Sequence, residues 1–247
     1  MYVSFGHHKN MRIVLLLLGL PVLLTAGEPK QFSSGETQVH LLELYSSEGC
    51  SSCPPAEQWV GGLREAPGLW RDFVPVSFHV NYWDRLGWRD KFANKEFTAR
   101  QYAYSSQWRT ESVYTPEFVL DGKEWRRRAS ENEPTRASTV SVGVLTVRYV
   151  DDQTCQVSFA SPGDYEAHVA LLGGGIVSNV KAGENDGRAL HHEFVAFAFK
   201  SAPLKKGVAD LALPGTTPAG VTRRALAVWV TKRGELAPVQ ATGGWLD

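Results

Sequence analysis

The stretch VHLLELYSSEGCSSCPP, residues 39–55, decides the fold of the first half of this chain. Residues 39–45 form a short apolar run that is typical of a buried strand, and the small polar residues and Gly49 after it indicate a turn. Pro54 and Pro55 suit the first turn of a helix, where a missing N–H leaves no hydrogen bond unmade. The stretch therefore predicts a buried strand that leads through two cysteines into a helix.

The sequence after this helix predicts a second strand, a second helix and a hairpin. Residues 73–80 are apolar enough for a strand buried on both faces, residues 93–108 show helical spacing, and residues 117–126 contain the Asp-Gly turn signal of a hairpin. The crossover connections imply parallel strands, and the hairpin adds an antiparallel edge. This order matches an α/β thioredoxin-like fold, which we assign to residues 37–129.

Residues 140–247 show a different pattern of short alternating stretches, which predicts a second, mostly antiparallel β-sandwich-like domain. The polar residues 130–139 between the two halves predict a linker or a short helix. A chain of 247 residues is long enough to bury two cores. The expected strands of the second half lie at 140–150, 155–160, 165–172, 190–200, 208–213 and 225–231.

The N-terminal residues 1–27 predict a signal peptide. Lys9 and Arg12 form a basic region before the apolar run 13–24, which is too short for a comfortable membrane span, and small residues follow it. An uncleaved anchor is the alternative. We therefore expect an exported protein, periplasmic or secreted, with no stable membrane span after the signal is cleaved.

The charge of the chain is nearly balanced. Without residues 1–26 the chain has 24 basic and 26 acidic side chains, a formal charge of minus two, because Lys9 and Arg12 are lost from 26 of each. We expect no nucleic-acid partner from this balance. The three cysteines are too few for a scaffold held together by disulfides, so the two close together suggest chemistry.

Cys50 and Cys53 form a Cys-Ser-Ser-Cys motif between the predicted strand and helix. The positive helix terminus stabilises a thiolate, so we expect Cys50, as the more exposed member, to attack substrate disulfides and Cys53 to resolve the mixed disulfide. The predicted function is thiol-disulfide exchange with protein or small-molecule thiols and disulfides. This chemistry needs no organic cofactor.

Five further residues are candidates for this site. Thr115 and Pro116 stand where a thioredoxin-like fold places a cis-proline loop, which would offer backbone hydrogen bonds to a bound peptide strand. Trp83 is expected to line the substrate site or to pack in the core. His79 and Asp84 are expected to support the cysteines, His79 through proton transfer or simply as a hydrogen-bonded side chain.

The same residues leave two other functions open. Cys50 and Cys53 could bind a soft metal such as copper(I), with His79 as a third ligand. In the other alternative, the protein is a non-enzymatic interaction protein whose disulfide is purely structural.

Two features of the second half complete the candidates. Residues 183–187 (GENDG) predict a turn, and His191 and His192 after it point to opposite faces of a strand, so we interpret this segment as a solvated hairpin that does not chelate one metal. Cys155 alternates with Val157 on one strand face and is expected to be a buried, unpaired core residue.

Several long strings of the chain together resemble one bacterial family. They are EGCSSCPPAE at 48–57, FHVNYWD at 78–84, LGWRD at 86–90, FTARQY at 97–102, VYTP at 113–116, and GENDG at 183–187 with Leu190 and His192. This pattern resembles the DUF1223 proteins over residues 39–246. The resemblance implies an exported bacterial protein with a thioredoxin-like fold and an uncharacterised function.

Overall fold

The computed structural model describes residues 1–4, 29–126, 136–151, 154–213 and 216–247. Most of the predicted signal peptide, 1–27, and of the predicted linker or short helix, 130–139, therefore lies outside the described residues. Residues 136–139 are not helical.

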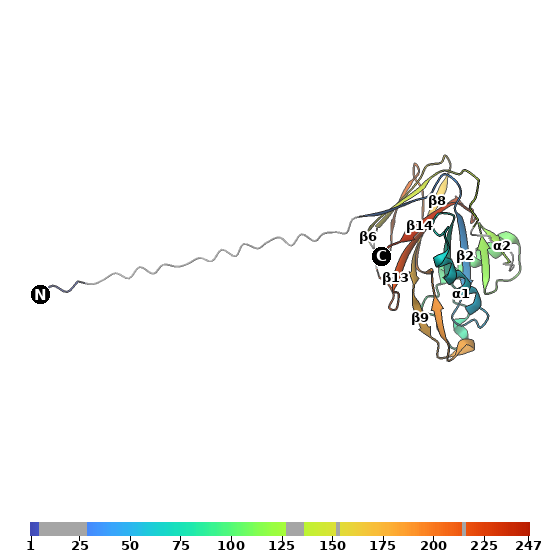
Figure 1. Ribbon diagram of the computed structural model, residues 1–247, viewed down its shortest axis with the longest axis horizontal. Coiled ribbons are helices and arrows are strands. Elements are labelled where there is room, and N and C mark those ends of the chain that lie inside the picture. The colour runs from blue at the N-terminus through green and yellow to red at the C-terminus, as the bar shows by residue number, and fades with distance from the viewer. Residues whose placement is uncertain (5–28, 127–135, 152–153, 214–215) are drawn as a thin grey trace.

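The core of the first half is the predicted alternation of strands and helices (Figure 1). Its two central strands run parallel, and the hairpin is antiparallel to them at one edge. Each helix follows a strand, as the apolar spacing and the two prolines predict. The elements are β2 (His40–Ser46), α1 (Pro54–Gly62), β3 (Phe73–His79), α2 (Lys95–Trp108), β4 (Glu117–Leu120) and β5 (Lys123–Glu124).

Strand β2 is buried on both faces because the two helices cover opposite sides of it. Arg100 of α2 donates two hydrogen bonds to Glu43 at 2.7 and 3.0 Å, whereas Ser46 donates to Glu57 of α1. Since neighbouring side chains of a strand point to opposite faces, residues 43 and 46 define the α2 side and the α1 side of the sheet. The buried Arg100–Glu43 pair holds α2 in place, as loss of one partner would leave an uncompensated buried charge.

The second half extends the same sheet. Strand β11 (Val195–Pro203) lies parallel beside β3, with Val195 opposite Ser77, and β8 (Tyr165–Gly174), β13 (Arg223–Lys232) and β14 (Pro238–Trp245) follow antiparallel. The eight strands therefore lie in the order β14-β13-β8-β11-β3-β2-β4-β5. Because this mixed sheet contains strands from both predicted domains, the division into two domains stays a prediction.

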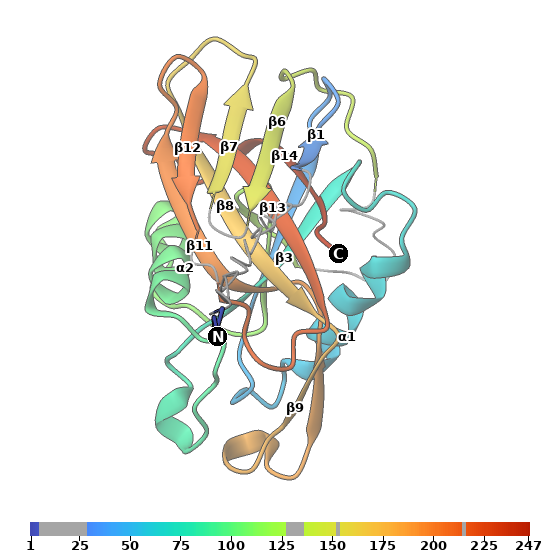
Figure 2. The same ribbon diagram turned by 90° about the vertical axis from the view of Figure 1, so that its left-hand side faces the viewer.

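A second, antiparallel sheet covers one face of this extension (Figure 2). Its order is β1-β6-β7-β12, and a separate apolar core fills the space between the two sheets. Cys155 is fully buried in this core with a free thiol, as predicted. The strands are β1 (Lys30–Ser33), β6 (Leu145–Asp151), β7 (Thr154–Phe159) and β12 (Val208–Ala212).

The predicted strand 190–200 is in fact two strands. It divides into β10 (Ala189–His192), which pairs only with β9 (Ile176–Asn179), and β11. The chain turns between them at Phe194, which has a φ of +57°. The β9–β10 hairpin therefore leaves the large sheet and lies against α1. Strands β1, β9 and β14 were not predicted from the sequence.

Within the described ranges, the structure contains no helix that is long and apolar enough to cross a membrane.

Candidate functional site

Cys50 and Cys53 form a disulfide at the junction of β2 and α1, with their Cα atoms 5.5 Å apart. The loop turns tightly, since the Cys50 N–H donates to the carbonyl of Ser47 and the Cys53 N–H donates to that of Cys50. Cys53 is the N-cap of α1. Both cysteines have 0% exposure, so the expectation that Cys50 is the more exposed member is wrong.

The loop before β4 covers the disulfide from one side. The Thr115–Pro116 peptide bond is cis, as predicted, and the Thr115 carbonyl oxygen lies 3.8 Å from Sγ of Cys50. The indole N–H of Trp83 donates to Oγ1 of Thr115 at 2.8 Å. A Cβ on Gly49 would lie only 3.1 Å from that of Trp83, so a larger residue here would require Trp83 to shift. Trp83 therefore fixes the cis-proline loop against the cysteine loop.

The turn between β9 and β10 covers the disulfide from the other side. Asn185 is fully buried, and its amide donates to the carbonyls of Glu48 at 2.8 Å and Cys50 at 2.9 Å. The Glu184 carboxylate accepts the N–H of Ser51 at 3.0 Å. The prediction of a solvated hairpin is therefore wrong for Asn185, because this turn closes over the Cys-Ser-Ser-Cys loop.

A cluster of buried charged side chains lies between α1 and the carboxyl ends of β2 and β3. Nδ1 of His79 donates to Asp90 at 2.7 Å, and Nδ1 of His192 donates to Glu57. Nε2 of His192 lies 3.4 Å from Oε1 of Glu48. The side chains of His79, Asp90 and His192 have no exposure at all.

The strand register explains how this cluster forms. Ser46 lies opposite His79 in the parallel β2–β3 pair, so both side chains point to the α1 side of the sheet. Glu57 stands on α1 one turn after Cys53 and accepts a hydrogen bond from Ser46. Strand β10 contributes His192 to the cluster. Side chains alternate along this strand, so His192 is buried and His191 is exposed.

Opposite charges stabilise the ionised forms of these groups despite their burial. Burial alone would lower the pKa of His192, but Glu57 and Glu48 outweigh it and raise this pKa to about 10. Burial also opposes the charge on His79, yet Asp90 raises its pKa. The pKa of Glu57 is lowered because the charges of His192 and His79 outweigh burial.

Asp84, the other predicted supporting residue, holds the loop that leads to Asp90. It lies in the short 3-10 turn Asp84–Leu86, and its Oδ1 accepts the N–H of Asp90 at 3.2 Å. Burial raises the pKa of its carboxyl group. Asp84 therefore acts on the cluster through Asp90, and no contact with the cysteines is found among the described residues.

The structure brings together Cys50, Cys53, Thr115, Pro116 and Trp83 as the sequence predicts. It groups His79 with Glu57 and His192 rather than with the sulfur atoms. Sequence reasoning missed four residues of the site. For Asn185 and His192, the only signal in the sequence was the turn motif at 183–187 with the histidine that follows it. The missed residues are Glu57, Asp90, Asn185 and His192.

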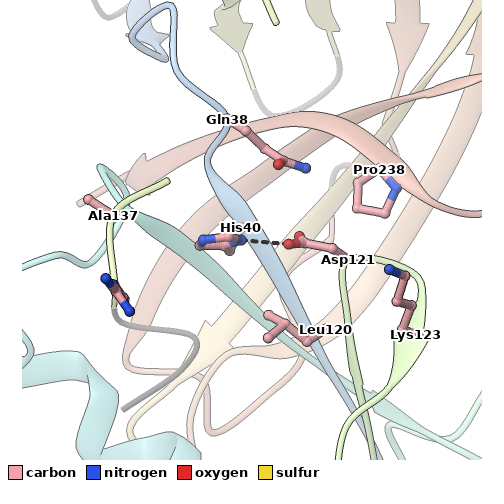
Figure 3. A pocket seen from close by; sticks show the side chains of 8 residues that line it. Gln38, His40, Leu120, Asp121, Lys123, Ala137 and Pro238 are labelled. Carbon is pink, nitrogen blue, oxygen red and sulfur yellow. Dashed lines mark hydrogen bonds and ion pairs between the residues drawn. The ribbon is translucent and has the colours of Figure 1, made fainter. Parts of the chain in front are cut away.

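A pocket of about 430 Å³ lies elsewhere, at the start of β2 (Figure 3). Nδ1 of His40 and Oδ2 of Asp121 form a hydrogen bond on its wall at 2.5 Å, and Lys123 points into the same region. Because His40 begins β2 and Cys50 follows the end of that strand, the pocket and the disulfide lie at opposite ends of β2. This pocket is therefore separate from the disulfide site.

Comparison with known proteins places the chain in a family. The family model described as a protein of unknown function (DUF1223) matches residues 41–231. The chain belongs to the DUF1223 family. No curated protein matches this DUF1223 protein.

Two solved structures are similar to the DUF1223 chain in fold. A crystal structure of a protein from Agrobacterium tumefaciens has 24% identity and a TM-score of 0.64, covering 85% of this chain and 95% of its own. HBP35 of Porphyromonas gingivalis has 11% identity and a TM-score of 0.53, covering 87% of this chain and 77% of its own. At these identities the similarity concerns the fold alone.

The two carbonyls held by Asn185 generate a prediction about access to the disulfide. Asn185→Ala removes both hydrogen bonds, so the DUF1223 protein should lose about 1–3 kcal/mol of stability and its disulfide should be reduced faster by dithiothreitol. The exposed neighbour Asp186 provides the control, Asp186→Ala. Equal reduction rates in both variants, measured under native conditions, would show that the turn does not restrict access.

A second prediction concerns Glu117, which follows Pro116 and accepts a hydrogen bond from Gln101 at 2.6 Å. Burial raises its pKa to about 6, above the ordinary value of 4.5, so the folded state favours the neutral acid. This contribution is present below about pH 4.5 and is lost as pH rises through about 6. As the pH rises from about 4.5 to about 6, the free energy of unfolding of wild type should fall by about 1–2 kcal/mol relative to that of Glu117→Gln.

Urea unfolding of both proteins at the two pH values measures this difference. Glu111→Gln changes an exposed carboxylate on the loop before β4 and serves as the control. A wild-type-to-Glu117→Gln difference that stays constant with pH would contradict the raised pKa.

Proposed function

We propose that this protein exchanges disulfides with protein or small-molecule thiols through Cys50 and Cys53. The observation that carries the proposal is the Thr115 carbonyl beside Sγ of Cys50, at 3.8 Å, where a bound substrate backbone would lie next to the reactive sulfur. The strand order β3-β2-β4-β5, with helices on both faces of β2, supports a thioredoxin-like interpretation of the first half.

The exchange proceeds in two balanced steps. A substrate thiolate attacks Sγ of Cys50, the Cys50–Cys53 bond breaks, and Cys53 leaves as a thiolate. A second substrate thiolate then attacks the substrate sulfur of the mixed disulfide, which releases the oxidised substrate and the Cys50 thiolate. The same steps in reverse reduce a substrate disulfide, with Cys50 as the nucleophile and Cys53 as the resolving thiol.

Several exposed side chains give the substrate a surface beside Cys50. Tyr114, directly before the cis-proline peptide, is 43% exposed. Ser51 and Ser52 are exposed within the cysteine loop itself. An extended peptide that pairs with the Thr115 backbone would contact these groups without a strong demand on its sequence.

The resting structure is closed, because neither sulfur is exposed. Exchange therefore requires the cysteine loop to move away from the Asn185 turn or from Thr115. The same burial favours the competing function, an interaction protein with a structural disulfide, so an experiment has to separate the two.

We place this activity in the bacterial envelope, to which the predicted signal peptide would deliver the protein. Disulfides persist in such oxidising compartments. Cys155 does not compete in the exchange, since burial raises the pKa of its thiol to about 12.

Trapping of the mixed disulfide tests the proposal. Cys53→Ser removes the resolving thiol, so this variant should accumulate one glutathione adduct on Cys50 when it is incubated with oxidised glutathione. Cys50→Ser is the matched control and should react about tenfold more slowly, because Sγ of Cys50 lies beside the Thr115 carbonyl at which a substrate would bind. Intact-mass spectrometry measures both rates. Equal rates, or no adduct on either variant, would contradict exchange through Cys50.

A further inference from the structure

The cluster behind the disulfide has the composition of a metal site. Glu57, His79 and His192 each offer one ligand atom, and these atoms lie within 4.8 Å of one another. All three residues are buried, and they come from three different elements, α1, β3 and β10. A modest adjustment would bring the three atoms to the bonds of about 2.0–2.2 Å that imidazole and carboxylate ligands make to zinc.

One buried nitrogen of this cluster, Nε2 of His79, has no hydrogen-bond partner among the described residues. Nε2 of His192, in contrast, faces Oε1 of Glu48 at 3.4 Å. Nε2 of His79 lies 3.9 Å from Oε1 of Glu57, too far for a hydrogen bond. A buried polar atom without a partner costs about 1–3 kcal/mol, so an imidazole nitrogen left unpaired beside a carboxylate requires an explanation.

The other ring nitrogen of His79 is held as it is in metal-binding histidines. Nδ1 of His79 donates to Asp90, whose carboxylate also accepts the N–H groups of Glu48 and Phe92, each at 2.9 Å. Nδ1 of His192 donates to Glu57. Carboxylates that accept the outer N–H fix the ring and leave Nε2 free for a metal. His79 therefore presents Nε2 as its free donor. In His192 the nitrogen that faces Glu57 is Nδ1, so an ion shared with Glu57 would bind Nδ1 in place of this hydrogen bond, and Glu48 would accept the N–H of Nε2.

We propose that Glu57, Nε2 of His79 and Nδ1 of His192 bind one divalent first-row transition-metal ion, such as Zn²⁺, with Glu48 as the carboxylate that holds the outer nitrogen of His192. Two imidazoles with a carboxylate suit ions of this class. Binding uses the neutral form of each ring and therefore releases protons. The ion would hold α1 and β10 together directly behind the disulfide.

This site is independent of the proposed exchange activity, because no sulfur atom belongs to it. It also differs from a copper(I) site on the two cysteines, since the disulfide is intact while the three ligands are in place. A protein that binds the metal could still have an inert disulfide, and an active disulfide would not require the metal.

Metal binding to the oxidised wild-type protein tests the proposal first. After treatment with a chelator, the protein should take up one equivalent of Zn²⁺ in equilibrium dialysis. X-ray absorption of the zinc-loaded protein should show a shell of nitrogen and oxygen with imidazole scattering and no sulfur. Absence of stoichiometric uptake, or a sulfur ligand, would overturn the proposal, and neither result depends on a variant that folds.

Variants then assign the ligands. His79→Gln and His192→Gln should each weaken Zn²⁺ binding by at least about 100-fold, and Asp90→Asn, which removes the partner of His79, by about 10–100-fold. His191→Gln is the matched control, because this exposed histidine is the direct neighbour of His192 on the opposite face of β10. The double variant Cys50→Ser/Cys53→Ser should bind zinc as wild type does. Unchanged binding in the two histidine variants would overturn the assignment.

Discussion

The hydrogen-bonded pair of His192 and Glu57 joins the two halves of this protein in its interior. Glu57 belongs to the helix that begins at the disulfide, and His192 belongs to a strand 135 residues further along the chain. Neither charge could stay in the apolar interior alone, because an unpaired buried ion costs several kcal/mol. The pair therefore requires the β9–β10 hairpin to lie on α1, and that position lets Asn185 close over the cysteine loop.

The sequence predicts those parts of the fold that depend on local patterns. The apolar runs before Gly49 and at 73–80, the paired prolines and the Asp-Gly turn lead to the observed strands, helices and hairpin. Strand β14 was missed because its PVQATGGW sequence has little apolar alternation. Close packing against neighbouring residues determines its position instead. A Cβ on Gly244, for example, would lie 2.2 Å from the ring of Phe32.

The candidate site was predicted only where its signal is local. Two motifs can be recognised from the local sequence alone, namely Cys50 with Cys53 and the Thr115–Pro116 peptide. Alternation along β10 correctly separates the faces of His191 and His192, but it does not say that the buried face meets Glu57. That contact depends on the parallel pairing of β11 with β3, a long-range pairing with no signal in either strand alone.

Two chemical groups thus share one small region, a closed disulfide and a buried histidine–carboxylate cluster behind it. Neither is explained by packing alone, since apolar side chains would fill the same space at lower cost. The measurement that bears most directly on the disulfide is its reduction potential, obtained by equilibrating the metal-free protein with glutathione and alkylating the free thiols. A reversible transition between about −120 and −270 mV is the result we expect for an exchange protein. A disulfide that stays oxidised below about −300 mV would contradict this function and mark Cys50–Cys53 as a structural bridge.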